Sequence, residues 1–384
     1  MRVIIAGGGT GGHLFPGIAI AMEFIAKDPE SSILFVGTGN PFEKSTVGKA
    51  GFNHKSITAE GIKGRGFFKT MRSLFKIPIG MFESFKIIKG FNPHIVVGVG
   101  GYSAGPVILT AWLLGVKTAL HEQNIIPGIT NRILARFAGR IYISFEGTKL
   151  PAAFGKTLVA GNPLRREIIN AAKDAAKDAA KADIVTGSGY QKPFTVLVLG
   201  GSQGAHSINM AIGEALTHIK AKEKYFFVHQ TGASDEKSVA GFYTQYGIPC
   251  IVKPFFDDMA KRYGQADLII CRAGATTVAE VTAMGRGAIF IPYPFAADDH
   301  QAKNARALSD AGAAEIITET DLNGKMLAER IEYFAGHSGE LYKMAAAAKK
   351  FSRPDAAEII VNDCYKIVNG EKKGTEAQRH KGTK

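Results

Sequence analysis

The chain has 384 residues, of which 46% are apolar and 21% charged, so it can bury a substantial core and is long enough for two domains. Three cysteines without paired spacing argue against a disulfide framework or a cysteine-based zinc site and fit a reducing cytoplasm. The net charge of +13 favours an anionic partner, such as nucleic acid, acidic lipid or a phosphorylated substrate. The start of the chain predicts no signal peptide, and no apolar run approaches the roughly 18 residues that span a bilayer.

Short, continuous apolar runs alternate with helical segments through the first part of the chain. A glycine loop follows the first run and leads into a helix that we expect to begin near Pro16, because proline suits the first turn of a helix. Runs of this kind are typical of a parallel sheet that helices cover on both faces. The predicted strands are residues 3–6, 33–37, 95–99, 117–120 and 140–143.

The same order of strand, glycine loop and helix then begins again, which predicts a second α/β unit. Its expected strands are residues 195–199, 225–228, 268–271 and 288–291. Residues 171–182, rich in Ala, Lys and Asp, predict an exposed helix without a chemical role, and we assign none to the insert at 171–190. We expect domains at 1–162 and 163–340, a helix at 341–369 that could pack back on the first domain, and a disordered basic tail at 370–384.

Glycine loops follow the first strand of each unit. Residues 7–13, GGGTGGH, allow close approach of a ligand to the backbone, and the next helix offers free N–H groups to a phosphate. A dinucleotide site also requires an acidic residue after the second strand, where this chain has Gly37-Thr38-Gly39, so a nicotinamide or flavin role is disfavoured. Ser202, in the second loop, can donate to a phosphate. Glu280 could accept hydrogen bonds from ribose hydroxyls or merely complement a helix dipole.

Several motifs, in a fixed order over roughly residues 1–350, resemble those of the MurG family of bacterial N-acetylglucosaminyltransferases. Two positions depart from better-known members: Ala273 stands where serine is common, and the helical insert after Arg165 is long. The motifs are GGTGGH at 8–13 with FPG at 15–17, GGYSAGP at 100–106, HEQN at 121–124, GNPLR at 161–165, GGSQGA at 200–205, FDDM at 256–259, RAGATTVAE at 272–280 and DHQAKNA at 299–305.

The resemblance implies an α/β protein of the GT-B fold, in which two Rossmann-like domains with parallel sheets face each other across a cleft. It implies inverting transfer of N-acetylglucosamine from UDP-N-acetylglucosamine to lipid I (undecaprenyl-pyrophosphoryl-MurNAc-pentapeptide), which forms lipid II for peptidoglycan. Phe256 would offer backbone groups to uracil, and Glu280 would hold the ribose. The residues carried over for the nucleotide sugar are Arg165, Ser202, Phe256, Ala275, Thr276, Thr277, Val278, Ala279, Glu280 and Gln301, with Thr10, Gly11, Gly12 and Asn124 on the N-terminal side.

An inverting transfer needs a base for the acceptor hydroxyl and positive character around the departing diphosphate. His13 is the candidate base, because it follows a glycine loop and an ordinary histidine pKa lies near the working pH. It could instead orient the loop or the acceptor. His121 and Glu122 are weaker candidates that we expect to shape the cleft. The chain has no D-x-D motif, so we predict no obligatory metal, and we predict no cofactor.

Residues 61–90 combine seven Lys or Arg with one acid and many apolar side chains. This stretch predicts either a core helix with a solvated basic face or a surface that docks on anionic lipid. Since the implied acceptor is polyprenyl-linked, we expect docking, on the cytoplasmic face of the cell membrane as a peripheral protein. Partners could include other cell-wall synthesis proteins.

Three other functions compete with this interpretation. A different GT-B transferase would use another sugar nucleotide and a diacylglycerol acceptor. A Rossmann oxidoreductase is disfavoured by the missing acidic residue. A nucleic-acid binder is suggested by charge alone and lacks a recognised module, so no nucleic-acid partner is predicted.

Overall fold

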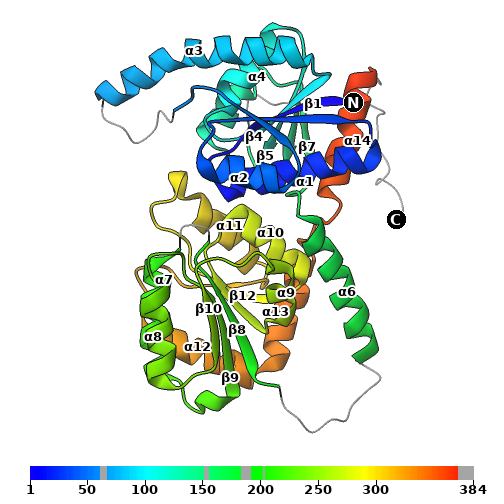
Figure 1. The fold of residues 1–384 in the computed structure, drawn as a ribbon. Coiled ribbons are helices and arrows are strands. Elements are labelled where there is room, and N and C mark those ends of the chain that lie inside the picture. Colours follow the sequence, from blue (N-terminus) through cyan, green and yellow to red (C-terminus); the bar gives the residue numbers. More distant parts are fainter. Residues whose placement is uncertain (61–66, 151–154, 183–191, 202–203, 371–384) are drawn as a thin grey trace.

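The computed structural model describes residues 1–60, 67–150, 155–182, 192–201 and 204–370, and side chains are described outside 67–75 and 176–182. Two α/β domains lie one above the other (Figure 1). Residues 371–384 of the tail predicted at 370–384, Ser202, and residues 183–191 lie outside the described residues.

The first domain is built on a seven-stranded sheet whose registered pairs are parallel, in the order β3-β2-β1-β4-β5-β6-β7. Its helices cover both faces, with separate apolar clusters on either side of the sheet. The strands are β1 (Arg2–Gly7), β2 (Ser32–Gly37), β3 (Asn53–Ser56), β4 (Ile95–Gly100), β5 (Lys117–Glu122), β6 (Arg140–Ile143) and β7 (Thr157–Val159); the helices are α1 (Gly11–Lys27), α2 (Pro41–Lys49), α3 (Phe67–Phe91), α4 (Ala104–Leu113) and α5 (Ile129–Leu134).

The second domain repeats the design with a six-stranded sheet in the order β10-β9-β8-β11-β12-β13, again parallel in every registered pair. Its strands are β8 (Phe194–Leu199), β9 (Tyr225–Gln230), β10 (Cys250–Lys253), β11 (Leu268–Cys271), β12 (Gly287–Phe290) and β13 (Glu315–Ile316). Its helices are α6 (Arg166–Ala182), α7 (His206–His218), α8 (Glu236–Tyr246), α9 (Met259–Gln265), α10 (Ala275–Met284), α11 (His300–Ser309), α12 (Gly324–Gly336) and α13 (Ser338–Lys349), with short 3₁₀ turns at Lys222–Lys224 and Ala297–Asp299.

The expected single helix at 341–369 is wrong, because two helices occupy this part of the chain. The first, α13, packs on β12 and α10 of the second domain, whereas α14 (Ala356–Asn369) packs on α1 of the first domain. Arg140 donates to both carboxylate oxygens of Asp363 at 2.9 and 2.7 Å, and this fixes α14 to β6, the strand next to the edge of the first sheet. Figure 1 shows α14 beside α1, at the top of the molecule.

The chain crosses between the domains twice, near Gly161 and again near Arg353. Gly161 has φ +92°, and a Cβ atom added there would lie 2.3 Å from the Cβ of Arg353. Only glycine satisfies both the conformation and the contact. The two crossings therefore lie against each other.

All the predicted strands are present, and the helix predicted at 171–182 forms the latter part of α6. The prediction that the first helix begins near Pro16 is wrong, since α1 begins at Gly11 and Pro16 lies inside it. Proline has no N–H to donate, so the carbonyl of Gly12, four residues earlier, is left without its usual helical partner. Among the described helices, none is both long enough and apolar enough to cross a bilayer.

Candidate active site

The two glycine loops of the first domain pack backbone against backbone at the carboxyl ends of β1 and β4. Gly7 has φ +137°, and a Cβ there would lie 2.2 Å from the carbonyl oxygen of Gly100. A Cβ on Gly101 would lie 2.6 Å from the oxygen of Gly8. Side chains are excluded at this contact, so the loops present main-chain groups where doubly wound sheets bind ligands.

His13 lies in the first turn of α1, with its ring over Gly100. A Cβ on Gly100 would come within 2.7 Å of the His13 Cδ2 atom, and the Thr10 hydroxyl lies 3.5 Å from its Nδ1 atom. Burial and the nearby charge of His300 lower the pKa of His13 to about 4, against a hydrogen bond to the Gly8 backbone that raises it. The expectation of a pKa near the working pH is therefore wrong: in the free protein His13 is neutral at neutral pH.

His121 belongs to a buried cluster of polar side chains close to His13. The amide nitrogen of Gln123 donates to His121 Nδ1 at 3.1 Å, so the ring proton is on Nε2, which faces the carbonyl of Gly161 at 3.2 Å. Burial, with smaller effects from its neighbours, lowers the pKa of His121 to about 4. The Glu122 carboxylate accepts from the backbone N–H groups of Asn124 and Gly128. These roles are structural, in line with the expectation that His121 and Glu122 shape the cleft.

Direct contacts join the first domain to the N-terminus of α10 in the second. The Thr276 hydroxyl donates to the Gly12 carbonyl at 3.2 Å, the acceptor that Pro16 leaves free. The buried Asn304 side chain donates to the Asn124 side-chain oxygen at 3.1 Å and to the Ala273 carbonyl at 3.3 Å. The predicted residues Thr10, Gly11, Gly12, Asn124 and Thr276 are thus gathered at one domain junction.

Arg165 and Glu280 form a largely buried ion pair at the same junction. Arg165 Nη2 donates to Glu280 Oε1 at 2.9 Å, and the Tyr263 hydroxyl donates to Oε2 at 3.0 Å. The Arg165 guanidinium also lies 4.9 Å from the centre of the Phe15 ring on α1. Glu280 is the sixth residue of α10, beyond the first turn in which a helix dipole acts strongly, so dipole complementation does not explain it.

The remaining predicted residues differ in how open they are. The side chains of Ala275 and Val278 are buried, so only their main-chain groups could meet a ligand, whereas Thr277 and Ala279 are partly exposed. Gln301 accepts from the Tyr293 N–H at 3.0 Å. Ser202 lies outside the described residues.

Gln230 links the second glycine loop to the segment that contains Phe256. Its amide nitrogen donates to the Gly201 carbonyl at 3.0 Å, and its oxygen accepts from the Phe256 N–H at 3.0 Å. The Phe256 side chain is buried. Its N–H is therefore already used, and its carbonyl is the main-chain group left to meet a uracil ring.

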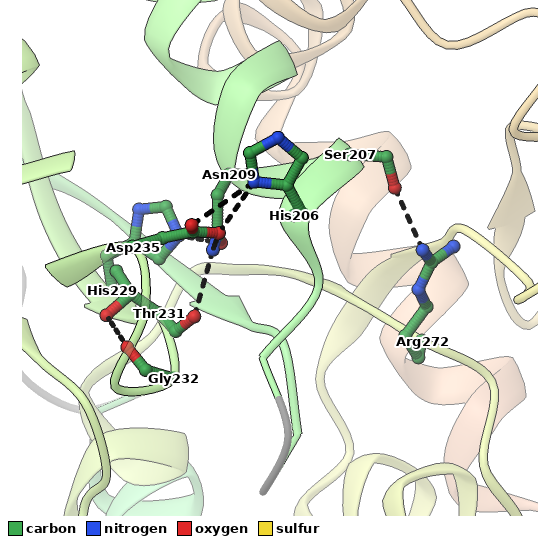
Figure 2. Close-up of polar contacts among 8 residues, drawn as sticks. All are labelled: His206, Ser207, Asn209, His229, Thr231, Gly232, Asp235 and Arg272. Carbon is green, nitrogen blue, oxygen red and sulfur yellow. Dashed lines mark hydrogen bonds and ion pairs between the residues drawn. The ribbon is translucent and has the colours of Figure 1, made fainter. Parts of the chain in front are cut away.

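A hydrogen-bonded network supports the start of α7 behind the second glycine loop (Figure 2). His206 Nδ1 lies 3.0 Å from Asp235, and Asn209 donates to Asp235 at 2.8 Å and to the Thr231 carbonyl at 2.9 Å. Arg272 donates to Ser207 at 2.9 Å, which joins α7 to the segment that leads into α10. The two helix N-termini suited to a diphosphate are thereby held together.

Sequence reasoning missed several residues of this junction. Asn304 lay within a quoted motif and Arg272 at the start of another, so their motifs were the available signal. Tyr263 and the buried Glu43 had no signal, because their partners are distant in sequence. Within the described residues, no group of three or more His, Cys, Asp or Glu is placed to hold a metal ion.

Comparisons with known proteins agree with this architecture. The Glycosyltransferase family 28 N-terminal domain matches residues 3–143, and its C-terminal domain matches residues 195–360. The chain is 47% identical to the UDP-N-acetylglucosamine–N-acetylmuramyl-(pentapeptide) pyrophosphoryl-undecaprenol N-acetylglucosamine transferase of Syntrophus aciditrophicus, over 96% of this chain and 99% of the relative. It is 45% identical to the transferase of the same name from Geobacter sulfurreducens, over 94% of this chain and 98% of the relative.

Solved structures give the same result. The crystal structure of Acinetobacter baumannii MurG is similar with a TM-score of 0.74 and 30% identity, over 95% of this chain and 99% of that one. A UDP-GlcNAc 2-epimerase from Neisseria meningitidis shares the fold alone. It is 11% identical, with a TM-score of 0.66 over 95% of this chain and 100% of that one. The chain is a glycosyltransferase of the GT-B fold, and it belongs to the MurG family within glycosyltransferase family 28.

Proposed function

We propose that this chain transfers N-acetylglucosamine from UDP-N-acetylglucosamine to lipid I, with inversion at the anomeric carbon, and so forms lipid II. The observation that carries the proposal is the meeting of His13 and the first glycine loop with the N-terminus of α10, through the Thr276–Gly12 hydrogen bond. A base on one domain and an anion-binding helix end on the other are the two parts that the reaction needs.

The second domain would hold the donor. The N-termini of α7 and α10 would face the diphosphate, and Thr277 offers a hydroxyl donor beside them, whereas the Thr276 hydroxyl donates to the Gly12 carbonyl. Glu280 retains an acceptor position for a ribose hydroxyl at Oε2: Oε1 accepts two hydrogen bonds from Arg165, Oε2 accepts one from Tyr263, and a carboxylate can accept about four. Arg165 would then add positive charge close to the nucleotide.

The first domain would hold the acceptor and remove its proton. As the acceptor hydroxyl oxygen bonds to the anomeric carbon, the bond to UDP breaks, the proton moves to neutral His13 and UDP leaves as the anion. A free-protein pKa of about 4 makes His13 a weak base. The negative charge of a bound diphosphate would raise that pKa and strengthen the base.

The test is transfer of radiolabelled sugar from UDP-N-acetylglucosamine to a lipid I analogue. His13→Ala should lower kcat by about 100-fold to 10,000-fold if His13 is the base. Glu280→Ala should mainly raise the KM for the donor, because it removes a ribose contact and the buried carboxylate that orients Arg165. His218→Ala and Glu340→Ala, on exposed helix surfaces, are the matched controls and should transfer normally. Absence of lipid II formation by the native protein would refute the proposal.

Membrane docking through α3 is the further part of the proposal. Ile79, Phe82 and Phe85 are 51%, 60% and 42% exposed, and Lys86 and Lys89 are also exposed on this helix. Apolar side chains beside lysines suit the interface of an anionic membrane, where the acceptor would reside. The basic residues at 63 and 65 lie outside the described residues, so the argument rests on the C-terminal half of the helix.

A further inference from the structure

We propose that Glu43 is a positioning residue for the transfer reaction: its buried carboxylate sets the conformation of the first glycine loop and thereby the place of His13. The inference rests on the proposed function, since it assigns a further residue to the same site. It depends on contacts that no motif in the sequence indicated.

The Glu43 carboxylate binds the glycine loop directly. Glu43 lies in the first turn of α2 and its side chain is fully buried. Oε1 accepts from the Gly9 N–H at 2.6 Å and from the Thr38 hydroxyl at 3.0 Å, and Oε2 accepts from the Gly39 N–H at 2.7 Å. One side chain therefore joins the loop after β1 to the loop after β2.

The neighbouring backbone is shaped around this carboxylate. A Cβ on Gly8 would lie 2.5 Å from Oε1, and a Cβ on Gly37 would lie 2.6 Å from Oε2. On the other side, Gly8 meets Gly101, whose added Cβ would lie 2.6 Å from the Gly8 oxygen. The first glycine loop is thus held between Glu43 and the second loop of the same domain.

Glu43 is present as the carboxylate at neutral pH. Burial alone would favour the neutral acid, but the nearby His54 ring, 3.7 Å from Oε2, and the hydrogen bonds from Gly39, Thr38 and Gly9 outweigh it and lower the pKa below its ordinary value. A carboxylate is an acceptor at both oxygens, and both backbone N–H groups require an acceptor. A glutamine would have to turn its NH₂ group toward one of them.

The geometry connects Glu43 to His13 over a short stretch of chain. Gly7, Gly8 and Gly9 have φ of +137°, +156° and +92°, a region in which glycine has unusual freedom. Thr10 follows, and its carbonyl accepts from the His13 N–H at 3.2 Å. Without the Gly9 hydrogen bond, this loop loses the contact that holds it from the α2 side, and the first turn of α1 shifts with it.

The experiment compares Glu43→Gln and Glu43→Ala with the native protein in the transfer assay. Misplacing a reacting group by about 1 Å can cost 100-fold, so Glu43→Ala should lower kcat by about 100-fold. Glu43→Gln should lose less, because one acceptor oxygen remains. The UDP affinity by calorimetry should stay at its native value, since the nucleotide part of the donor would be held by the second domain.

Glu214→Gln is the matched control, because that carboxylate also accepts a backbone N–H, from Gly324 at 3.0 Å, within the second domain. It should transfer at the native rate. Native kcat in both Glu43 variants would overturn the proposal, and so would a kcat loss matched by an equal loss of UDP-binding protein, which indicates general unfolding. If the native protein itself transfers no sugar, the proposed function fails instead, and UDP binding distinguishes the two results.

Discussion

The imidazole of His13 shows how strongly distant residues determine the chemistry of one side chain. Its place after a glycine loop follows from the sequence, but its neighbours Gly100 and His300 come from loops far along the chain. Burial against the first and charge from the second move its pKa away from that of a free histidine. The candidate base was therefore predictable as a residue, whereas its protonation behaviour was not.

This low pKa has a measurable consequence for the pH dependence of transfer. The pH profile of kcat/KM for the donor reports the enzyme before the donor binds, so it should be flat from pH 8 to about 5 and fall only as His13 takes up a proton near pH 4. The profile of kcat reports the complex, in which the diphosphate charge raises the pKa, so its acid limb should lie at higher pH. Steady-state rates with varied donor at saturating acceptor measure both, and an acid limb near pH 6.5 in kcat/KM for the donor would contradict the assignment.

At the scale of elements, strands with continuous apolar runs in the sheet interiors were predicted, and short strands at the sheet edges were missed. β3 reads Asn-His-Lys-Ser, and β13 has only two residues; both are at sheet edges, where one side needs no apolar partner. β7 and β10 also lie at the edges and are short. An edge strand pairs because its neighbour is already in place, and that information is not local.

The exposed face of α3 gives a prediction about membrane binding. Changing Ile79, Phe82 and Phe85 together to Ser should weaken binding to phosphatidylglycerol vesicles by at least about 100-fold, since each buried apolar side chain contributes about 1.5–3 kcal/mol. Vesicle co-sedimentation measures this. Tyr342→Ser, which removes an exposed aromatic ring from α13, is the control and should bind normally. Unchanged binding of the triple variant would exclude this face of α3 as the membrane-binding surface. With a short-chain soluble acceptor, the triple variant should show the native kcat.

At the scale of the molecule, the restarted strand–glycine–helix pattern predicted two facing α/β domains, and the fold confirms them. The pattern left open whether the C-terminal helix packs back on the first domain, as α14 does, because the contacts of that helix, such as Arg140 with Asp363, join residues far apart in the sequence. Family membership decides against the oxidoreductase and nucleic-acid alternatives.

Buried neutral histidines in both domains predict acid sensitivity of the whole fold. Burial lowers the pKa of His121 to about 4. Burial also lowers the pKa of His229 to about 3, although the charge of Asp235 acts in the opposite direction. Between those values and about 6.5, the unfolded chain binds protons that the folded chain does not, so stability is lost as pH falls. Each histidine should remove about 1.4 kcal/mol per pH unit in that window.

Urea unfolding at several pH values between 7.5 and 4.5 measures this dependence. His229→Gln should give a shallower slope of unfolding free energy against pH, whatever its effect on stability at neutral pH. A native slope of zero across the window would contradict the prediction.

The paired crossings at Gly161 and Arg353 have a consequence for how the domains can move. Because α14 belongs to the first domain, the second domain is topologically an insertion, entered and left at neighbouring points. A body attached by one linker can turn in any direction, whereas a body attached at two adjacent points turns most easily about the line that joins them. Opening and closing of the cleft is therefore reduced to nearly one degree of freedom, and each closure returns Thr276 to the same carbonyl.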